Sequence, residues 1–462
     1  MTSSPSAFGL DGVARAQLLE RLLFRRAGDR PDRRVSVETT QRSIRQKLGN
    51  PKIREDLQQM RDASKILDLE NPFFRSHDGI AGATTSIGGR TIDNFVSYDY
   101  LGLNGDPRLL EAANAAMRRY GTSVSASRLV SGERPVHREL ETALANIYDA
   151  EDCLTLVSGH ATNVTVIGHL LGPGDAIIHD ALAHNSIIQG AVLSGARRLP
   201  FAHNDVLALD QTLRSVRGPA SRVLVVIEGH YSMDGDRPDL AAMLAVTRRH
   251  GAWLMVDEAH SLGVLGATGR GLAEDCGIDP SEVDLWMGTL SKTLCACGGY
   301  VAGSRDLIDY LRCSAPGFVY SVGLPAPTAA VAFEALRVMR AEPWRTRRLA
   351  DNGALFRQCA KAAGLNTGLS VGAAIVPVIT GSSLSAARVA DLLFRRGINV
   401  QPILHPAVPE QSARLRFFLS ASHEPEAIRR VVTETASAVA HAALMKPDAA
   451  GLAVRLAFDT TR

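Results

Sequence analysis

The stretch LMVDEAHSLGVLG (Leu254–Gly266) joins a run of apolar residues to a cluster of polar ones. The apolar letters up to Val256 predict a buried β-strand, and the polar residues begin at its carboxyl end. Similar short apolar segments recur along the chain and alternate with longer amphipathic segments. This alternation predicts a mostly parallel sheet with helices on both faces, in which ligands bind at the carboxyl ends of the strands. The predicted strands are Cys153–Val157, Ala176–Ile178, Val223–Ile227, Trp253–Val256 and Leu285–Met287, and the predicted helices are Val136–Tyr148, Ser186–Leu193, Leu240–His250, Arg305–Arg312 and Pro325–Arg340.

Four letters of this stretch, from Asp257 to His260, spell a motif that names a class of nucleic-acid helicases. That function requires a phosphate-binding loop, GxxxxGK[ST], in which backbone N–H groups and a lysine hold the nucleotide. The segment GTLSKT (Gly288–Thr293) contains a lysine followed by a threonine but lacks the glycine directly before the lysine. The lysine also follows the acidic motif, which is the reverse of the expected order. A DEAH-type ATPase is therefore only a remote alternative.

Asp257, His260 and Lys292 follow successive predicted strands. A carboxylate buried at a strand end is unfavourable unless it has a partner, and a pyridinium N–H is one such partner. A lysine in the adjacent loop can form a Schiff base with the aldehyde of the same ring. Thr289 and Ser291 offer hydroxyl groups to a phosphate. Each residue alone has a structural explanation, as a helix cap or a solvated loop residue, but together they favour pyridoxal phosphate as the cofactor.

The composition is that of a globular protein. The chain has 462 residues, of which 45% are hydrophobic and 21% charged, and its formal net charge of +3 does not indicate nucleic acid as a partner. The 6 cysteines show no paired CxxC spacing, so no metal site or disulfide framework is predicted, and reduced thiols favour a cytoplasmic location. No apolar run reaches the roughly 18 residues that span a membrane, and the N-terminus lacks the layout of a signal peptide.

The chain is expected to have four parts. Residues 1–70 form a helical leader, in which GLDGVARAQLLERLLFRRAG (Gly9–Gly28) carries leucines at helical spacing and several arginines. Residues 71–335 form a large cofactor-binding domain, with residues 71–92 as its lead-in. Residues 336–445 form a smaller α+β domain, and residues 446–462 are a tail.

Motifs of polar and glycine residues cover about four-fifths of the chain, from about Asn71 to Ala440. They are YDYLGL (Tyr98–Leu103), SRLVSG (Ser127–Gly132), SGHATN (Ser158–Asn163), DALAHNS (Asp180–Ser186), FAHND (Phe201–Asp205), EGHYSMDGD (Glu228–Asp236), GTLSK (Gly288–Lys292) and ARLRFFLSASH (Ala413–His423). In order and spacing they resemble those of the α-oxoamine synthases, which include serine palmitoyltransferase and 8-amino-7-oxononanoate synthase. The resemblance implies a fold-type I, aspartate aminotransferase-like transferase with pyridoxal 5'-phosphate as cofactor. It also implies a large mostly parallel sheet domain followed by a smaller C-terminal α+β domain.

The resemblance implies catalytic roles for the matching residues. Lys292 is the Schiff-base lysine and the acid and base at Cα, and Asp257 pairs with the pyridine nitrogen. His260 hydrogen-bonds the phenolic oxygen of the ring, and His184 stacks on its face. Arg416 binds the carboxylate of the amino acid, because a planar guanidinium can hold it with two hydrogen bonds.

The resemblance also implies the remaining cofactor and substrate contacts. The phosphate loop begins at Ser158, Gly159 and His160, and Thr289 and Ser291 lie on its other side. The site near the substrate is lined by Glu228 and Ser232, and Tyr98 faces the substrate pocket. Ser321 reaches the phosphate bound by the neighbouring subunit. The role of Ser321 implies a homodimer with shared active sites.

The reaction implied by the family is a decarboxylative Claisen-type condensation. A small amino acid (serine, glycine or alanine) reacts with an acyl thioester of coenzyme A or a carrier protein, and an α-amino ketone is formed. An aminotransferase or aldol-type enzyme with the same cofactor is the nearest alternative, and an inactive scaffold is a remote one.

The sequence departs from the family pattern at three positions. His160 stands where the family has an aromatic residue, and His230 stands where valine is usual. Tyr98 replaces a common asparagine and is closer to serine palmitoyltransferase-like members, so it bears on the choice of substrate. The patterns assign no role to Glu258.

The basic segment GLDGVARAQLLERLLFRRAG resembles the leader of modules in non-ribosomal peptide and polyketide assembly lines. This resemblance implies natural-product biosynthesis, with an acyl carrier protein that docks on the basic helix and delivers the acyl group. The alternative is an ordinary amphipathic helix that packs on the dimer.

Overall fold

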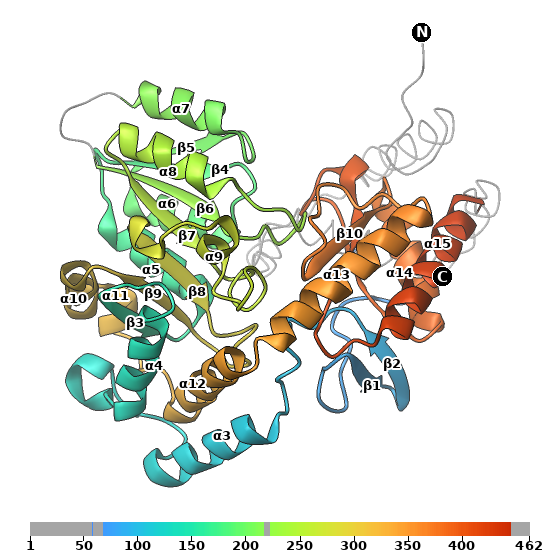
Figure 1. Ribbon diagram of the computed structural model, residues 1–462, viewed down its shortest axis with the longest axis horizontal. Helices are drawn as coiled ribbons and strands as arrows, with labels where there is room; N and C mark the ends of the chain where they lie inside the picture. Colours follow the sequence, from blue (N-terminus) through green and yellow to red (C-terminus); the bar gives the residue numbers. More distant parts are fainter. Residues whose placement is uncertain (1–57, 59–67, 217–221, 445–462) are drawn as a thin grey trace, which may run out of the picture.

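A computed structural model describes residue 58, residues 68–216 and residues 222–444 of the chain. They form two lobes joined by long helices (Figure 1). The larger lobe contains a seven-stranded sheet of order β3-β9-β8-β7-β6-β4-β5, in which β9 runs antiparallel to its neighbours β3 and β8 and the strands from β5 to β8 run parallel. The strands are β3 (Asp152–Leu156), β4 (Ala176–Asp180), β5 (Arg197–Phe201), β6 (Val223–Glu228), β7 (Trp253–Asp257), β8 (Leu285–Thr289) and β9 (Gly299–Gly303).

Helices cover both faces of this sheet, because successive residues of a strand point to opposite sides. In the central strand β7, Leu254 packs in a core with residues of α4, α8 and α12, whereas Met255 packs in a second core with residues of α5, α6 and α10. Both side chains are fully buried. The helices of this lobe are α3 (Pro107–Tyr120), α4 (Pro135–Ala145), α5 (Gly159–Leu170), α6 (Asn185–Ser194), α7 (Val206–Ser215), α8 (Leu240–Arg249), α9 (Leu272–Cys276), α10 (Arg305–Ser314), α11 (Pro316–Val319) and α12 (Ala326–Ala341), with the short turns η2 (Arg128–Gly132) and η3 (Pro280–Glu282).

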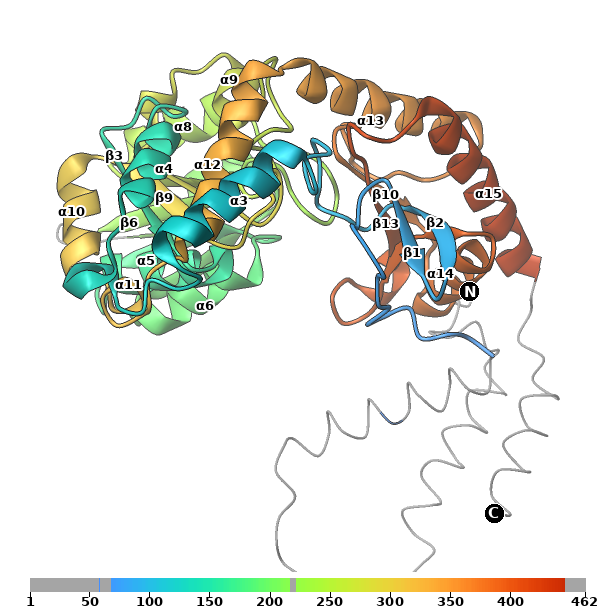
Figure 2. The ribbon, with the colours of Figure 1, turned by 90° about the horizontal axis from the view of Figure 1, so that it is seen from below.

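The smaller lobe is built from the C-terminal part of the chain. Its antiparallel sheet has the order β10-β13-β12, and α13 runs from the large lobe to this sheet (Figure 2). The elements are α13 (Trp344–Ala362), β10 (Ile375–Ile379), α14 (Ser383–Arg395), β11 (Ile398–Asn399), β12 (Gln401–Ile403), η4 (Glu410–Ser412), β13 (Arg414–Phe418) and α15 (Pro425–Leu444).

The lead-in segment 71–92 does not lie on the large sheet. It contains β1 (Thr84–Ile87), which forms an antiparallel hairpin with β2 (Arg90–Asn94), and β2 pairs in parallel with β11 of the C-terminal lobe. The sequence-based division grouped residues 71–92 with the large domain, whereas this long-range pairing joins the hairpin to the small one. The predicted leader helix (Gly9–Gly28) and the tail 446–462 lie outside the described residues.

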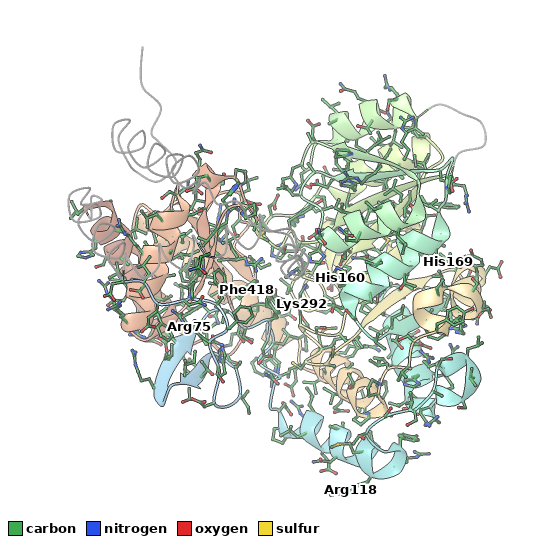
Figure 3. All side chains as sticks on the ribbon, turned by 180° about the vertical axis from the view of Figure 1, so that it is seen from behind. Arg75, Arg118, His160, His169, Lys292 and Phe418 are labelled. Carbon is green, nitrogen blue, oxygen red and sulfur yellow. The ribbon has the colours of Figure 1, made fainter. Side chains whose placement is uncertain are left out.

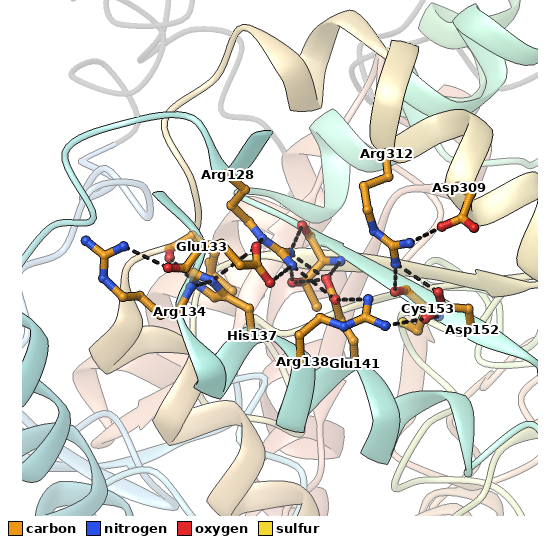
Figure 4. A network of polar contacts seen from close by, with 12 residues as sticks. Arg128, Glu133, Arg134, His137, Arg138, Glu141, Asp152, Cys153, Asp309 and Arg312 are labelled. Carbon is orange, nitrogen blue, oxygen red and sulfur yellow. Dashed lines mark hydrogen bonds and ion pairs between the residues drawn. The ribbon is translucent and has the colours of Figure 1, made fainter. Parts of the chain in front are cut away.

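A buried ion network fastens η2 and α4 to the edge strand β3 (Figure 4). Arg128 Nη1 donates to Glu141 Oε1 at 2.5 Å and to Thr155 Oγ1 at 3.0 Å, while its Nε donates to Glu133 Oε2 at 2.6 Å. The side chains of Arg128 and Glu141 are 2% and 0% exposed. Each charge is stabilised by the other, because an isolated charge at this depth would be strongly unfavourable.

The predicted fold class is confirmed, since the mostly parallel sheet with helices on both faces and the smaller α+β lobe are both present. Strand β9 was not among the predicted strands, because its sequence GYVAG begins and ends with glycine, a residue of low strand propensity. The structure explains this composition: a Cβ on Gly299 would lie 2.7 Å from the Cα of Gly159 at the start of α5. None of the helices in the described residues is long and apolar enough to cross a bilayer.

Candidate active site

The predicted site residues gather where the parallel strands of the large sheet end and the small lobe begins. Glu228 and Asp257 are the last residues of β6 and β7 and are paired in the ladder. Lys292 Nζ of the large lobe lies 5.7 Å from the centroid of the Tyr98 ring, and that ring packs against Phe418 of the small lobe (Figure 3). The carboxyl ends of the strands therefore face the second lobe, as expected for a ligand site in such a sheet.

Asp257 is a buried carboxylate held by amide groups. Its Oδ2 accepts from Asn163 Nδ2 at 2.8 Å and its Oδ1 from the backbone N–H of Ala259 at 2.9 Å, and the carboxylate forms no ion pair within the described chain. The residue is 4% exposed. A buried carboxylate with only neutral donors can stabilise a cationic N–H group, because the attraction is strong where water is excluded.

Lys292 lies in the loop after β8. Its Nζ is 5.7 Å from the centroid of the Tyr98 ring. Burial lowers the pKa of the amine to about 8, although the charges of Asp257 and Glu228 oppose this change. About one tenth of the amine is therefore neutral at pH 7, far more than for an ordinary lysine with a pKa of about 10.4, and the neutral form is the one a nucleophilic or basic lysine requires.

Hydrogen bonds orient the two predicted ring-binding histidines. His184 caps α6, its Nδ1 lies 2.7 Å from Ser186 Oγ, and its backbone N–H donates to Glu228 Oε1 at 2.6 Å. His260 Nδ1 lies 2.7 Å from the Tyr100 hydroxyl. Burial lowers the pKa of both imidazoles, so both are neutral near pH 7.

Glu228 is a second carboxylate at the same edge of the sheet. Burial and the neighbouring charge of Asp257 raise the pKa of Glu228 to about 8. Like charges this close disfavour simultaneous ionisation. Glu228 therefore holds the His184 loop largely as a neutral acid near pH 7.

The start of α5 and the end of β8 form an anion-binding cradle. Ser158 caps the helix, and the unpaired N–H groups of its first turn favour a phosphate. A Cβ on Gly159 would lie 2.7 Å from Thr289 Oγ1, so only glycine allows these segments to approach so closely. The backbone N–H of Ser291 donates to Thr289 Oγ1 at 3.2 Å, and the exposed ring of His160 lies 6.3 Å from that of His184.

These groups fit pyridoxal phosphate. The cradle at α5 matches an anion, Asp257 matches a protonated ring nitrogen, and Lys292 matches an aldehyde. The fit rests on three groups that lie at one edge of the sheet. They are a carboxylate without a cationic partner in the described chain, a lysine with a lowered pKa and the N-terminus of a helix.

Arg416 reaches the site from strand β13 of the small lobe. Its Nη1 donates to the carbonyl of Ser232 at 3.0 Å, its Cζ lies 4.7 Å from the centroid of the Phe418 ring, and its Nε is buried without a partner. Tyr98, which is 40% exposed, packs edge-on against Phe418 at 4.9 Å. The structure thus brings Tyr98, Ser232 and Arg416 to the side of the site that faces Lys292.

Ser321 is the predicted site residue that the described chain does not bring to the others. Its Oγ donates to the carbonyl of Val322 at 3.2 Å, beside Tyr320, which is 86% exposed. The sequence prediction requires a neighbouring subunit for its contact, and that contact stays a prediction.

Two residues of the site were not named from the sequence. Asn163 and Tyr100 lie within the motifs SGHATN and YDYLGL, but the motifs do not say which partners they bind. The available signal was that each lies in a motif that also carries a predicted site residue, Ser158 in SGHATN and Tyr98 in YDYLGL.

Glu258, to which the sequence assigned no role, holds the glycine-rich turn that follows β7. Its Oε1 accepts from the backbone N–H of Leu272 at 2.9 Å. Gly271, with a φ of +93°, passes so close that a Cβ there would lie 1.9 Å from Glu258 Oε2. Glu258 therefore supports the fold behind the site. His230, also unassigned, is fully buried, and its Nδ1 lies 3.1 Å from the carbonyl of Asp236.

Comparison with known proteins identifies the family. A family model described as aminotransferase class I and II matches residues 91–434. The chain is 43% identical over 349 residues to a putative 8-amino-7-oxononanoate synthase from Gloeobacter violaceus, and the match covers 76% of this chain and 89% of the relative. It is 40% identical over 383 residues to the 8-amino-7-oxononanoate synthase from Geobacter sulfurreducens, and that match covers 82% of this chain and 96% of the relative. The structure of the Sphingomonas wittichii serine palmitoyltransferase superposes with a TM-score of 0.81 at 30% identity, covering 84% of this chain and 98% of that one.

The chain therefore belongs to the aminotransferase class I and II family and has the fold-type I architecture. Within that family it is an α-oxoamine synthase, a pyridoxal-phosphate-dependent C-acyltransferase. Enzymes of this class join an amino acid to an acyl thioester with loss of CO₂.

Proposed function

We propose that this enzyme condenses a small amino acid, with serine as the first candidate, with an acyl thioester and releases an α-amino ketone. Serine is named in the serine palmitoyltransferase that superposes on the chain, and alanine and glycine are the other candidates. The side chain of Tyr98 between Phe418 and Lys292 supports a small amino acid, because an aromatic ring there limits the space above the lysine.

The observation that carries this proposal is that the buried guanidinium of Arg416 has no carboxylate partner within the described chain. Two positions earlier on the same face of β13, Arg414 donates to Asp234 Oδ1 at 2.5 Å and is neutralised. Arg416 has no acidic partner within the described chain, and burial lowers its pKa without removing its charge at neutral pH. A buried cation of this kind is strongly stabilised by a carboxylate ligand, and the planar guanidinium can bind it with two hydrogen bonds.

Pyridoxal phosphate supplies an aldehyde that combines with the amino acid and a ring that accepts the electron pair left at Cα. The residues that would hold that ring are Asp257 at the ring nitrogen, His260 at the ring oxygen and His184 against one face. Arg416 would hold the carboxylate of the amino acid and so restrict the orientation of its Cα relative to the ring. Positioning of this kind accounts for a large part of the rate enhancement.

Lys292 moves the proton at Cα. With a pKa of about 8, its amine can remove a proton from Cα and return one after CO₂ has left. The neutral carboxyl group of Glu228, held by the backbone of His184, adds no second negative charge where carbanion character develops.

We also propose a homodimer in which Ser321 of one subunit contacts the phosphate bound by the other. The exposed apolar side chains next to it, Tyr320 (86%) and Val322 (52%), support burial against a second copy, because apolar surface is stabilised when it leaves water.

For the acyl donor we propose an acyl carrier protein, in a pathway of natural-product biosynthesis. The support is the basic segment Gly9–Gly28, which lies outside the described residues, and the usual acidity of carrier proteins. Coenzyme A thioesters are the alternative donors.

The decisive experiment is mass spectrometry of the products from serine, glycine and alanine, each with acyl-coenzyme A and acyl-carrier thioesters of several lengths. We expect one mole of CO₂ and one of free thiol for each mole of α-amino ketone, and no product with the Lys292→Ala variant. An aminotransferase would instead form a keto acid and a new amino acid without thiol or CO₂. Full turnover with carrier thioesters after deletion of residues 1–35 would contradict the docking role of the leader.

A further inference from the structure

His203 lies between two carboxylates on separate segments of the large lobe. Its Nδ1 is 2.8 Å from Asp180 Oδ1 and its Nε2 is 2.8 Å from Asp236 Oδ2. Burial lowers the pKa of His203, but the hydrogen bonds to the two carboxylates outweigh burial and raise the pKa to about 10. The side chain is therefore an imidazolium near neutral pH, with both N–H groups donated to anions.

We call the contacts of His203 with Asp180 and Asp236 the His203 bridge. At its Asp180 end, the bridge holds the loop that carries His184. Asp180 ends β4, and its Oδ1 also accepts from the backbone N–H of Leu182 at 2.8 Å. Its Oδ2 accepts from the backbone N–H of Asn204 at 2.8 Å. The carboxylate thus fixes the turn between β4 and α6, at whose end His184 stands.

On the other side the bridge holds the loop that carries Ser232. Asp236 Oδ2 also accepts from Asn204 Nδ2 at 2.8 Å, and the backbone carbonyl of Asp236 accepts from the N–H of Tyr231 at 2.9 Å. The ring of Tyr231 packs edge-on against His203 at 4.6 Å. The carbonyl of Ser232, within the loop that these contacts close, accepts the 3.0 Å hydrogen bond from Arg416.

From this geometry we propose that His203 is a positioning residue: by bridging Asp180 and Asp236 it fixes His184, which covers the ring, relative to Arg416, which holds the substrate carboxylate. The assignment of those two partners rests on the proposed function. His203 itself contacts neither of them, so it acts through the two loops. A shift of the order of 1 Å between a ring and a carboxylate clamp is enough to reduce turnover strongly.

The test compares His203→Gln with a matched control. Glutamine keeps a donor group, its amide NH₂, and a similar length, but it loses the charge and presents a carbonyl oxygen, which cannot donate, in place of the second ring N–H. His250→Gln is the control, because His250 Nε2 also lies 2.8 Å from a carboxylate oxygen, that of Asp210, away from the site. Hydrogen–deuterium exchange of the cofactor-free proteins reports the loops directly, without any reaction.

We expect His203→Gln to raise exchange in both segments, 181–186 and 229–236, and His250→Gln to change neither. In the loaded enzyme we expect the KM for the amino acid to rise at least about tenfold, as for loss of a charge-assisted hydrogen bond, with a smaller change in the KM for the thioester. His203→Arg, which restores a cation with several donors, should recover part of the loss.

Faster exchange in only one segment, or an unchanged KM for the amino acid together with a lower melting temperature, would overturn the positioning role. If His203→Gln does not fold, Asp236→Asn replaces it: this variant keeps the His203–Asp180 contact, so it should raise exchange in segment 229–236 alone and raise the KM for the amino acid, and an unchanged KM would overturn the positioning role. Absence of condensation in the wild-type enzyme would count against the proposed function, whereas the exchange result tests the bridge independently.

Discussion

Replacing Arg416 with lysine tests the assignment of the carboxylate site. Lysine keeps the positive charge but cannot present two parallel N–H groups, and it loses the flat contact with Phe418, whose centroid lies 4.7 Å from the guanidinium carbon. The hydrogen bond to the Ser232 carbonyl, 3.0 Å in the structure, would also compete for the single ammonium group. The substitution therefore weakens the grip on a carboxylate without removing the charge.

The size of the effect follows from the lost hydrogen bond. A hydrogen bond to a charged group contributes about 1.5–3 kcal/mol. Because each 1.4 kcal/mol corresponds to a factor of ten, kcat/KM for the amino acid should fall about 10- to 150-fold. Most of the loss should be in KM, since the carboxylate is bound in the ground state as well as during the reaction.

Steady-state kinetics with serine varied at saturating thioester measure this effect, and the KM for the thioester serves as an internal reference. Arg414→Lys is the matched control, because Arg414 is already paired with Asp234 and lysine can keep that ion pair. The reasoning is refuted if Arg416→Lys and Arg414→Lys change the KM for serine equally, or if Arg416→Lys leaves it unchanged.

Two further predictions concern stability and pH. Glu141→Gln should lower the free energy of unfolding by about 3–5 kcal/mol, because it removes the closest anionic partner of the buried Arg128. Urea unfolding measures this change. A decrease below about 1 kcal/mol, as for surface ion pairs, would contradict the buried network. Capture of pyridoxal phosphate by the cofactor-free enzyme should accelerate as pH rises through about 8 and then level off, because the neutral Lys292 amine is the reacting form. Stopped-flow absorbance measures this rate. The Glu228→Gln variant, which removes the other group with a pKa of about 8, should keep a single rise and move it to lower pH, because the charge of Glu228 raises the pKa of the lysine. A rise that continues to pH 10 in the wild-type enzyme would show an unperturbed lysine.

Much of the site was predictable because its residues follow consecutive strands of one parallel sheet. Asp257 and Lys292 end up at the same edge for a topological reason: parallel strands joined by helices bring their carboxyl ends together. Pattern alone could therefore place these two residues beside each other and exclude a nucleotide-binding loop.

The second layer of the site was not predictable in this way, because its contacts join distant parts of the chain. Tyr100 and His260, which contact each other, are 160 positions apart in the sequence. Asn163 and Asp257, which share a hydrogen bond, are 94 positions apart. No periodicity or spacing specifies such pairs. They depend on how the loops pack after the sheet has formed.

The sequence by itself determined the fold class, the family and the residues at the strand ends, since hydrophobic periodicity and strand-end chemistry are local properties. The tertiary structure decided what the remaining polar residues do. The sequence predicts no role for Glu258, which lies between Asp257 and His260 in LMVDEAHSLGVLG. In the fold, its side chain accepts a hydrogen bond from the backbone N–H of Leu272 behind the site. Likewise the sequence does not distinguish Arg414 from Arg416, and only the position of Asp234 in the fold gives Arg414 an acidic partner and leaves Arg416 without one within the described chain.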